Sequence, residues 1–223
     1  MHKALLLLLL LFVAPSGAET VTIGTTRIPY EAPQGFARVD TLFPLHLKEL
    51  DEEFGMKSMV FAKYVPVTYL EAREKDQEAL PDWYIHLVYD ENLSKIPLFW
   101  PGFVMIAALA DKVITREYAS DAFINKLENV FSHAIDRKLT ITGMTQKGFV
   151  EKKGNTRSML ATGHATIEGK AAPVELPIAS MTTFVLERYK LITMIQIGRI
   201  NSDADLPAFT KQALNRASQM FPQ

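Results

Sequence analysis

Two histidines, His86 and His164, have the chemistry for acid–base work or for metal binding. Each lies in a segment of alternating side chains that predicts a β-strand. Neutral imidazole suits both proton transfer and metal coordination, so two such groups facing one cavity could share a metal ion or act as acid and base. The sequence does not bring them together, and we expect each to be a hydrogen-bonded structural residue. His46 and His133 fall in predicted amphipathic helices and are expected to face solvent.

Carboxylates cluster at two places, Asp51-Glu52-Glu53 and Asp203-x-Asp205. We interpret the first as the polar face of a helix end, and the second as charge at a helix N-terminus, where the macrodipole favours it. Neither has the Asp-x-Asp-x-Asp-Gly form of a calcium loop. The methionines are scattered, which is typical of core filling rather than of copper ligands. The sequence therefore predicts no metal site.

Local signatures of common enzyme classes are missing from the sequence. It has no Gly-x-Ser-x-Gly elbow, no Gly-x-x-x-x-Gly-Lys phosphate loop, no Gly-x-Gly-x-x-Gly fingerprint and no His-Glu-x-x-His zinc helix. It contains no cysteine, which excludes disulfides, thiolate metal sites and cysteine nucleophiles. With 24 basic and 25 acidic side chains, it lacks the basic excess of a nucleic-acid binder. We expect a protein that acts by binding, without a cofactor.

The least ordinary passage is residues 96–110, fifteen residues without a charge. As a helix it would span about 22 Å, less than the roughly 30 Å of a hydrocarbon core, and Pro101-Gly102 is expected to break it in half. We interpret it as a buried strand or loop that runs into the next helix. The alternative is an exposed apolar surface that meets a lipid, a ligand or a partner. Its candidate contact residues are Phe99, Trp100 and Phe103.

A predicted hairpin tip carries four basic side chains: Lys147, Lys152, Lys153 and Arg157. They could touch anionic headgroups, but Glu151 lies among them and no row of interleaved aromatic residues extends beyond Phe149. We interpret them as charges that keep an exposed tip soluble.

Turn residues and side-chain periodicity predict the elements that must hold these groups. The first half contains a hairpin and short extended runs over 21–40, an amphipathic helix over 42–54, one or two strands over 56–70 and a central strand over 82–90. The second half contains a helix over 120–135, a meander over 138–150, 156–167, 174–186 and 191–200, and a helix over 203–221. We therefore predict one α+β domain over 19–223: an antiparallel sheet, made of the N-terminal hairpin and the four-stranded meander, with packed amphipathic helices.

This order of elements resembles the Mog1/PsbP-like class of α+β proteins, found in many small exported proteins. The features that carry the resemblance are the hairpin with its Pro33-Gln34-Gly35-Phe36 turn, the helix around 123–131, the meander with its Tyr189 hairpin and the closing helix at 209–221. The passage 96–110 and the helix over 42–54 depart from the class. The resemblance implies an accessory, assembly or binding role without a shared catalytic centre, so it carries no functional residue over.

Residues 1–18 predict an export signal, with a basic start, a leucine-rich stretch, and small Ser16 and Ala18 before the expected cleavage. The mature chain would begin at Glu19, and an exported chain without disulfides fits a bacterial periplasm best. We thus expect a periplasmic, non-catalytic protein that binds a protein partner or an apolar ligand. The alternatives are a hydrolase-like enzyme with dispersed catalytic residues, and a peripheral membrane protein that uses residues 96–110.

Overall fold

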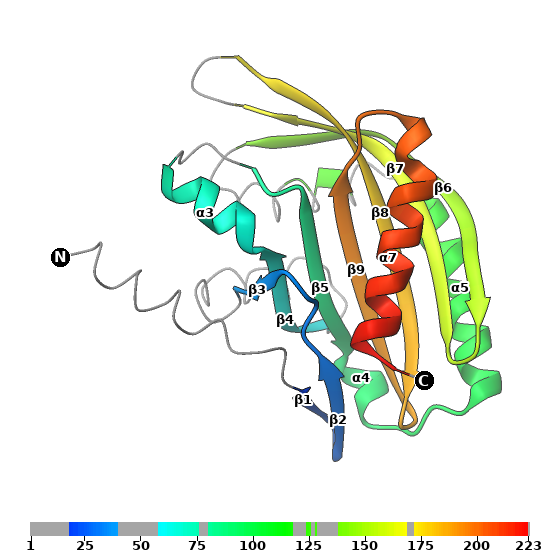
Figure 1. Ribbon diagram of the computed structural model, residues 1–223. Coiled ribbons are helices and arrows are strands. Elements are labelled where there is room, and N and C mark those ends of the chain that lie inside the picture. The colour runs from blue at the N-terminus through cyan, green and yellow to red at the C-terminus, as the bar shows by residue number, and fades with distance from the viewer. Residues whose placement is uncertain are drawn as a thin grey trace.

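The computed structural model describes residues 18–39, 58–75, 80–117, 124–125, 128, 138–168 and 172–222. Its strands form a two-stranded antiparallel sheet, β1-β2, and a seven-stranded antiparallel sheet in the order β3-β4-β5-β9-β8-β7-β6 (Figure 1). The strands are β1 (Ala18–Ile23), β2 (Thr26–Glu31), β3 (Phe36–Arg38), β4 (Ser58–Pro66), β5 (Trp83–Asp90), β6 (Leu139–Lys153), β7 (Thr156–Ile167), β8 (Val174–Glu187) and β9 (Lys190–Arg199). The helices are α3 (Val67–Lys75), α4 (Glu91–Ser94), α5 (Trp100–Glu117), the 3-10 turn η1 (Asp203–Asp205) and α7 (Leu206–Met220).

The predicted α+β class is confirmed, with the meander present as β6 to β9. β5 is a central strand as expected, because it pairs with β4 on one side and with β9 on the other. The expected strand over 56–70 is wrong at its end: Pro66 closes β4, and α3 begins at Val67. Of the helices expected over 42–54 and 120–135, the first lies outside the described residues, and of the second only 124–125 and 128 are described.

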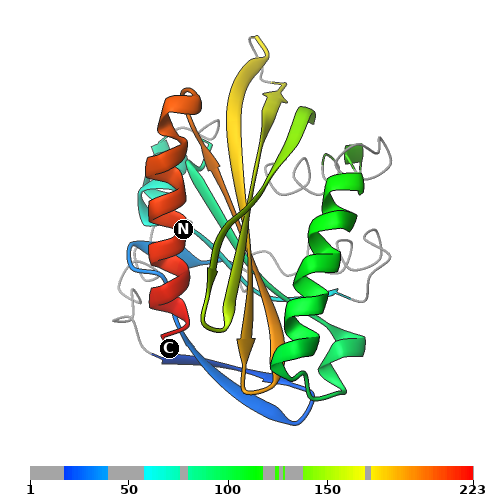
Figure 2. The ribbon, with the colours of Figure 1, turned by 90° about the vertical axis from the view of Figure 1, so that its right-hand side faces the viewer.

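Helices α5 and α7 cover opposite faces of the large sheet (Figure 2). Two neighbouring side chains of β8 show both faces: Phe184 packs in the cluster beneath α5, whereas Val185 packs with Ala217 and Met220 of α7. Successive side chains of a strand point to opposite faces, so the sheet supports a core on each side.

Helix α7 approaches the sheet closely because small residues stand where the two surfaces meet. A Cβ at Gly198 would lie 2.7 Å from the Phe209 ring, which is too close for any side chain there. With glycine at that position, the Phe209 ring stacks on Trp83 with centroids 4.6 Å apart. The buried stripe of α7 is Phe209, Ala213, Ala217 and Met220, as its helical spacing predicts.

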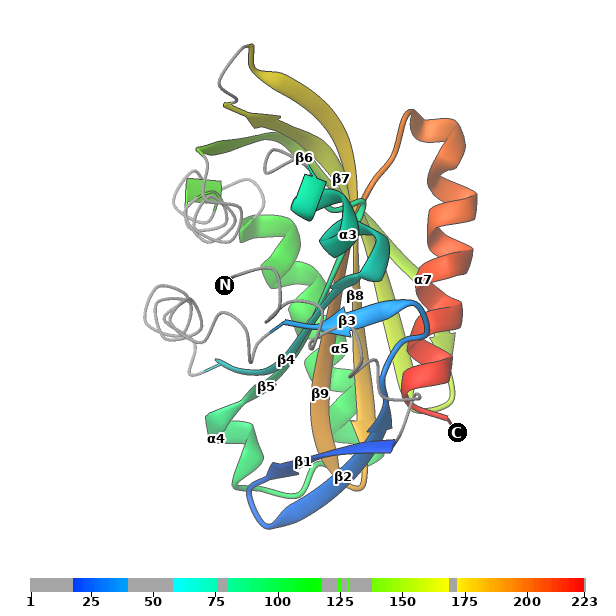
Figure 3. The ribbon, with the colours of Figure 1, turned by 60° about the vertical axis from the view of Figure 1, so that its left-hand side comes forward.

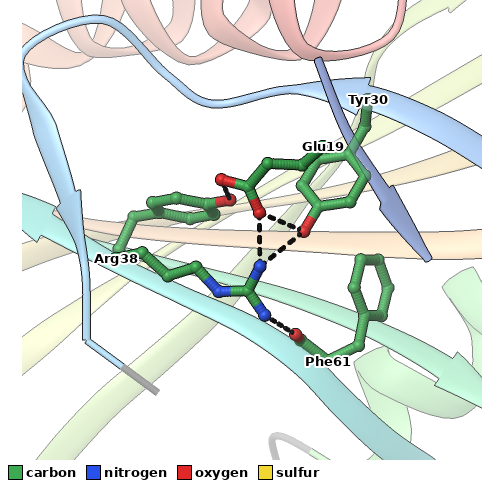
Figure 4. A network of polar contacts seen from close by, with 5 residues as sticks. Glu19, Tyr30, Arg38 and Phe61 are labelled. Carbon is green, nitrogen blue, oxygen red and sulfur yellow. Dashed lines mark hydrogen bonds and ion pairs between the residues drawn. The ribbon is translucent and has the colours of Figure 1, made fainter. Parts of the chain in front are cut away.

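The β1-β2 hairpin lies across the end of the sheet near the β8-β9 turn (Figures 1 and 3). Its carboxylate Glu19 accepts hydrogen bonds from the hydroxyls of Tyr30 (2.7 Å) and Tyr64 (3.0 Å) and pairs with the Arg38 guanidinium. Arg38 also donates to the carbonyl oxygen of Phe61 at 2.8 Å (Figure 4). This network joins β1, β2, β3 and β4, and so ties the first described strand to the main sheet.

Candidate functional site

The apolar passage 96–110 is neither a strand nor a buried loop, because residues 100–110 form the first turns of α5. Pro101-Gly102 does not break this helix. The pair lies in its first turn, where a proline lacks only an N–H that has no intrahelical partner. Within the described ranges, no helix combines the length and apolar character that a bilayer span requires.

A patch of large apolar side chains is exposed along α5 and beside its start. Phe99 is 61% exposed, Met105 60% and Trp100 45%. We define the apolar lip as Ile96, Phe99, Trp100, Val104, Met105, Leu109 and Tyr189. Large contiguous apolar surfaces of this kind mark sites of contact with proteins, membranes or ligands.

Phe103 does not belong to the lip. The prediction that it is a contact residue is wrong, because its exposed fraction is 0% and it lies in the core. It lies on the side of α5 that faces the sheet, together with Ala107. There it packs in one cluster with Met159, Phe184 and Leu191. The sequence predicted three contact residues, and the structure leaves two of them, Phe99 and Trp100, accessible.

Lys190 holds the segment that presents the lip. Its ammonium is buried and donates hydrogen bonds to the carbonyl oxygens of Ser94 (2.7 Å) and Ile96 (3.1 Å). These carbonyls lie at the C-terminal end of α4, where the helix dipole favours a positive charge. The adjoining Leu98 N–H donates to the Tyr189 carbonyl oxygen at 2.8 Å. The chain from α4 to α5 is therefore fastened to the β8-β9 turn.

Tyr189 is a residue of the lip that sequence reasoning used only as a turn marker. Arg188 and Tyr189 have φ values of 48° and 64°, so the two-residue turn has the left-handed conformation that suits a hairpin. This turn directs the Tyr189 ring outward, and its centroid lies 5.4 Å from that of Phe99. The sequence did contain a signal for this contact residue, because a bulky aromatic side chain stands at a hairpin tip, where polar residues are usual.

The basic hairpin tip predicted from the sequence adjoins the lip. The guanidinium carbon of Arg157 lies 4.7 Å from the Trp100 ring centroid and 5.7 Å from that of Phe103. The Lys152 ammonium lies 4.7 Å from the Phe149 ring centroid, and Phe149 packs against the same cluster as Phe103. Cations above aromatic faces are attracted by the ring quadrupole, so Arg157 steadies Trp100.

The two histidines that could have formed one site lie on opposite faces of the sheet. His86 aligns through Ile195 and Thr182 with Met159, which packs under α5. His164 follows Met159 by five positions in β7. An odd number of positions turns its side chain to the other face of the sheet, where it is exposed. Three strand spacings separate β5 from β7, roughly 14 Å. A shared metal ion or an acid–base pair is therefore wrong for these residues.

His86 lies instead beside a buried lysine. It pairs across strands with Lys63, and both side chains are buried. Burial, together with the smaller effect of the positive charge of Lys63, lowers the pKa of His86 from 6.5 to about 3. An imidazole with so low a pKa is a poor general base near neutral pH.

The carboxylates at 203–205 have the structural role that the sequence predicts. Asp205 accepts hydrogen bonds from the backbone N–H groups of Asn201 (2.9 Å) and Ser202 (3.2 Å), and a capping box with Ser202 starts the helical segment. The cluster at 51–53 lies outside the described residues. Among the residues that the structure describes, no three His, Asp or Glu side chains are grouped to hold a metal ion.

No lip residue lines either of two hollows in the described part of the molecule. A pocket between Leu80, Leu139 and Ile178 has a volume of about 80 Å³, well below the roughly 300 Å³ of small ligand sites. A groove of about 500 Å³ runs beside α7 and has charged Glu151 and Lys211 among its lining residues. The first is therefore too small for a ligand, and the second is partly charged.

No protein-family model matches this chain, and no curated protein matches its sequence.

Proposed function

We propose that this chain is an exported α+β protein of the bacterial envelope that acts by binding, and that its binding surface is the apolar lip. The observation that carries the proposal is the exposure of Trp100 and Met105 on a helix whose other side is already packed on the sheet, with Phe99 exposed just before it. While they face water, these side chains do not stabilise the fold. Binding of a partner that covered them would be favoured by roughly 25 cal/mol for each Å² of apolar surface removed from water.

Two features of the sequence support the location. Residues 1–18 have the pattern of a cleaved export signal, and the chain has no cysteine for an oxidising compartment to pair. Export predicts a protein from the periplasmic fraction whose N-terminal residue is Glu19. Mass spectrometry of the intact protein would test this, and a chain that retained residues 1–18 would contradict it.

The lip is tested by photo-crosslinking in intact cells. We would place benzoylphenylalanine at Met105 on the lip or at Gln219, an exposed residue of α7 on the opposite face. We expect many covalent adducts with a binding partner from position 105 and few from position 219. Equal yields at the two positions, or none at either, would argue against the lip as the binding surface.

A hydrolase-like enzyme is one of the two other functions that the sequence left open, and no specific observation favours it. It would use His86 or His164 together with a carboxylate, but His86 is buried beside Lys63 and His164 lies exposed on the other face of the sheet. Binding at the lip is therefore the function that the geometry supports best.

A further inference from the structure

We infer that the partner of the apolar lip is the surface of an anionic phospholipid bilayer, into which the outer side of α5 inserts. This inference rests on the proposed function and names its partner. Two observations support it: the amino-acid composition of the lip, and the positive charges near it.

The lip has the composition of a surface that lies at a lipid interface. Residues 100–110 contain no polar side chain, so the exposed side of α5 is apolar through its first three turns. Trp100 and Tyr189 add amphipathic rings, which are favoured at the level of lipid headgroups, and Phe99 adds an apolar ring. Among the described elements, α5 is the long helix that covers this face of the sheet (Figure 2). It can therefore lie parallel to a membrane with its apolar side embedded, as interfacial helices do.

Four basic side chains lie near the lip. We define the basic rim as Lys95, Lys112, Lys152 and Arg157. The three lysines are exposed, whereas Arg157 is half-buried against Trp100. The chain as a whole has a net charge of −1, so these charges are a local feature. Each lysine or arginine close to an anionic bilayer strengthens binding about fivefold.

The acidic side chains described on the same elements are less exposed than the three rim lysines. Glu91, Asp111 and Glu187 are half-buried, and Glu151 lines the groove beside α7 on the opposite face. The most exposed charges at the border of the lip are therefore positive, which fits phosphate headgroups.

The same border argues against a second copy of this chain as the partner. A symmetric dimer places the same patch on both subunits, so the two basic rims would face each other across the interface. Like charges brought together in this way oppose association, whereas an anionic bilayer attracts them.

The two tryptophans provide a direct test, because Trp100 lies on the lip and Trp83 is stacked on Phe209 beneath α7. The protein recovered from exporting cells is mixed with vesicles of brominated phosphatidylcholine, with or without about 30% phosphatidylglycerol. Bromine on the acyl chains quenches only a tryptophan that reaches them. Trp83→Phe reports on Trp100, and Trp100→Phe reports on Trp83. If Trp83→Phe does not fold, the difference between the wild-type and Trp100→Phe signals gives the same quantity.

We expect Trp100 to be quenched by roughly half and its emission to shift to the blue with vesicles that contain phosphatidylglycerol. Trp83 should be unaffected. Lys95→Gln and Lys152→Gln should each weaken the partitioning about fivefold, and salt should weaken it as well. No quenching of Trp100, or equal quenching with and without phosphatidylglycerol, would overturn the inference.

Two other results would also overturn it while leaving the proposed function in place. One is an adduct between position 105 and a protein in cells, together with an unquenched Trp100. The other is a blue shift of Trp100 that depends on protein concentration in the absence of vesicles, which would make a second copy the partner. Failure of the crosslinking test at both positions would instead remove the proposed function itself.

Discussion

The Lys190 ammonium donates a hydrogen bond of 2.7 Å to the carbonyl oxygen of Ser94, which lies 96 residues earlier in the chain. It donates a second bond to the Ile96 carbonyl oxygen. A buried ammonium at the end of α4 thus decides where the chain leading to α5 runs. The position of the apolar lip depends on this contact as much as on the residues of the lip.

Lys190→Met should therefore loosen the segment that carries the lip. Methionine keeps the length of the side chain but leaves two carbonyl groups without their donor, so we expect the free energy of unfolding to fall by about 1–3 kcal/mol. Hydrogen exchange of the amides at 94–99 should quicken. Lys95→Met, at an exposed neighbouring site, is the matched control. Similar exchange in both variants would show that Lys190 does not hold the segment.

Arg157→Ala should free the Trp100 ring. Loss of the cation above the ring costs about 1 kcal/mol of folding free energy, and acrylamide should quench Trp100 more efficiently in a Trp83→Phe background. Arg199→Ala removes an exposed arginine far from the lip and serves as the control. An unchanged acrylamide quenching constant for Arg157→Ala would contradict the contact.

The tyrosines around Glu19 predict a loss of stability at alkaline pH. Burial raises the pKa of Tyr30 and Tyr64 above the ordinary value of 10.0, and the nearby Glu19 raises it further. The unfolded chain therefore releases these protons first. The free energy of unfolding should be at its full value below pH 10 and fall as the pH rises above it.

Tyr64→Phe checks the origin of this alkaline effect. The variant loses the hydrogen bond to Glu19 and should be about 1 kcal/mol less stable at neutral pH. Its stability should then decline less steeply above pH 10, measured by urea unfolding at several pH values. If the absorbance of phenolate showed that both buried tyrosines lose their protons before the wild type unfolds, the raised pKa values would be contradicted.

His86 predicts a loss of stability in acid. Its pKa is about 3 in the folded protein against 6.5 in an unfolded chain, because burial disfavours the imidazolium. The stabilisation is present above pH 6.5 and is lost as the pH falls from 6.5 towards 3, by a few kcal/mol. His86→Gln should flatten the stability profile across this range, whereas His164→Gln, at an exposed site, should leave it unchanged.

The strands and turns of the meander were predictable from the sequence because their signals are local. Alternating side chains specify a strand and turn residues specify its end, so β5 to β9 lie close to their expected ranges. Helix α3 was not predictable in this way, because Val67, Thr68 and Tyr69 are residues that favour strands. The burial of Tyr69 against Val39 and Val65, a tertiary contact, accompanies the helix there.

By itself, the sequence determined that residues 96–110 are uncharged, that Phe99, Trp100 and Phe103 stand among them, and that a basic hairpin tip follows. Only the tertiary structure decided which of these side chains face water. Residues 100–110 are apolar on every side of their helix, so periodicity carries no information about the side that meets the sheet. Packing buries Phe103 and leaves Phe99 and Trp100 outside. Strand pairing, which acts between segments far apart in the chain, brings Arg157, Tyr189 and Lys190 to the same place.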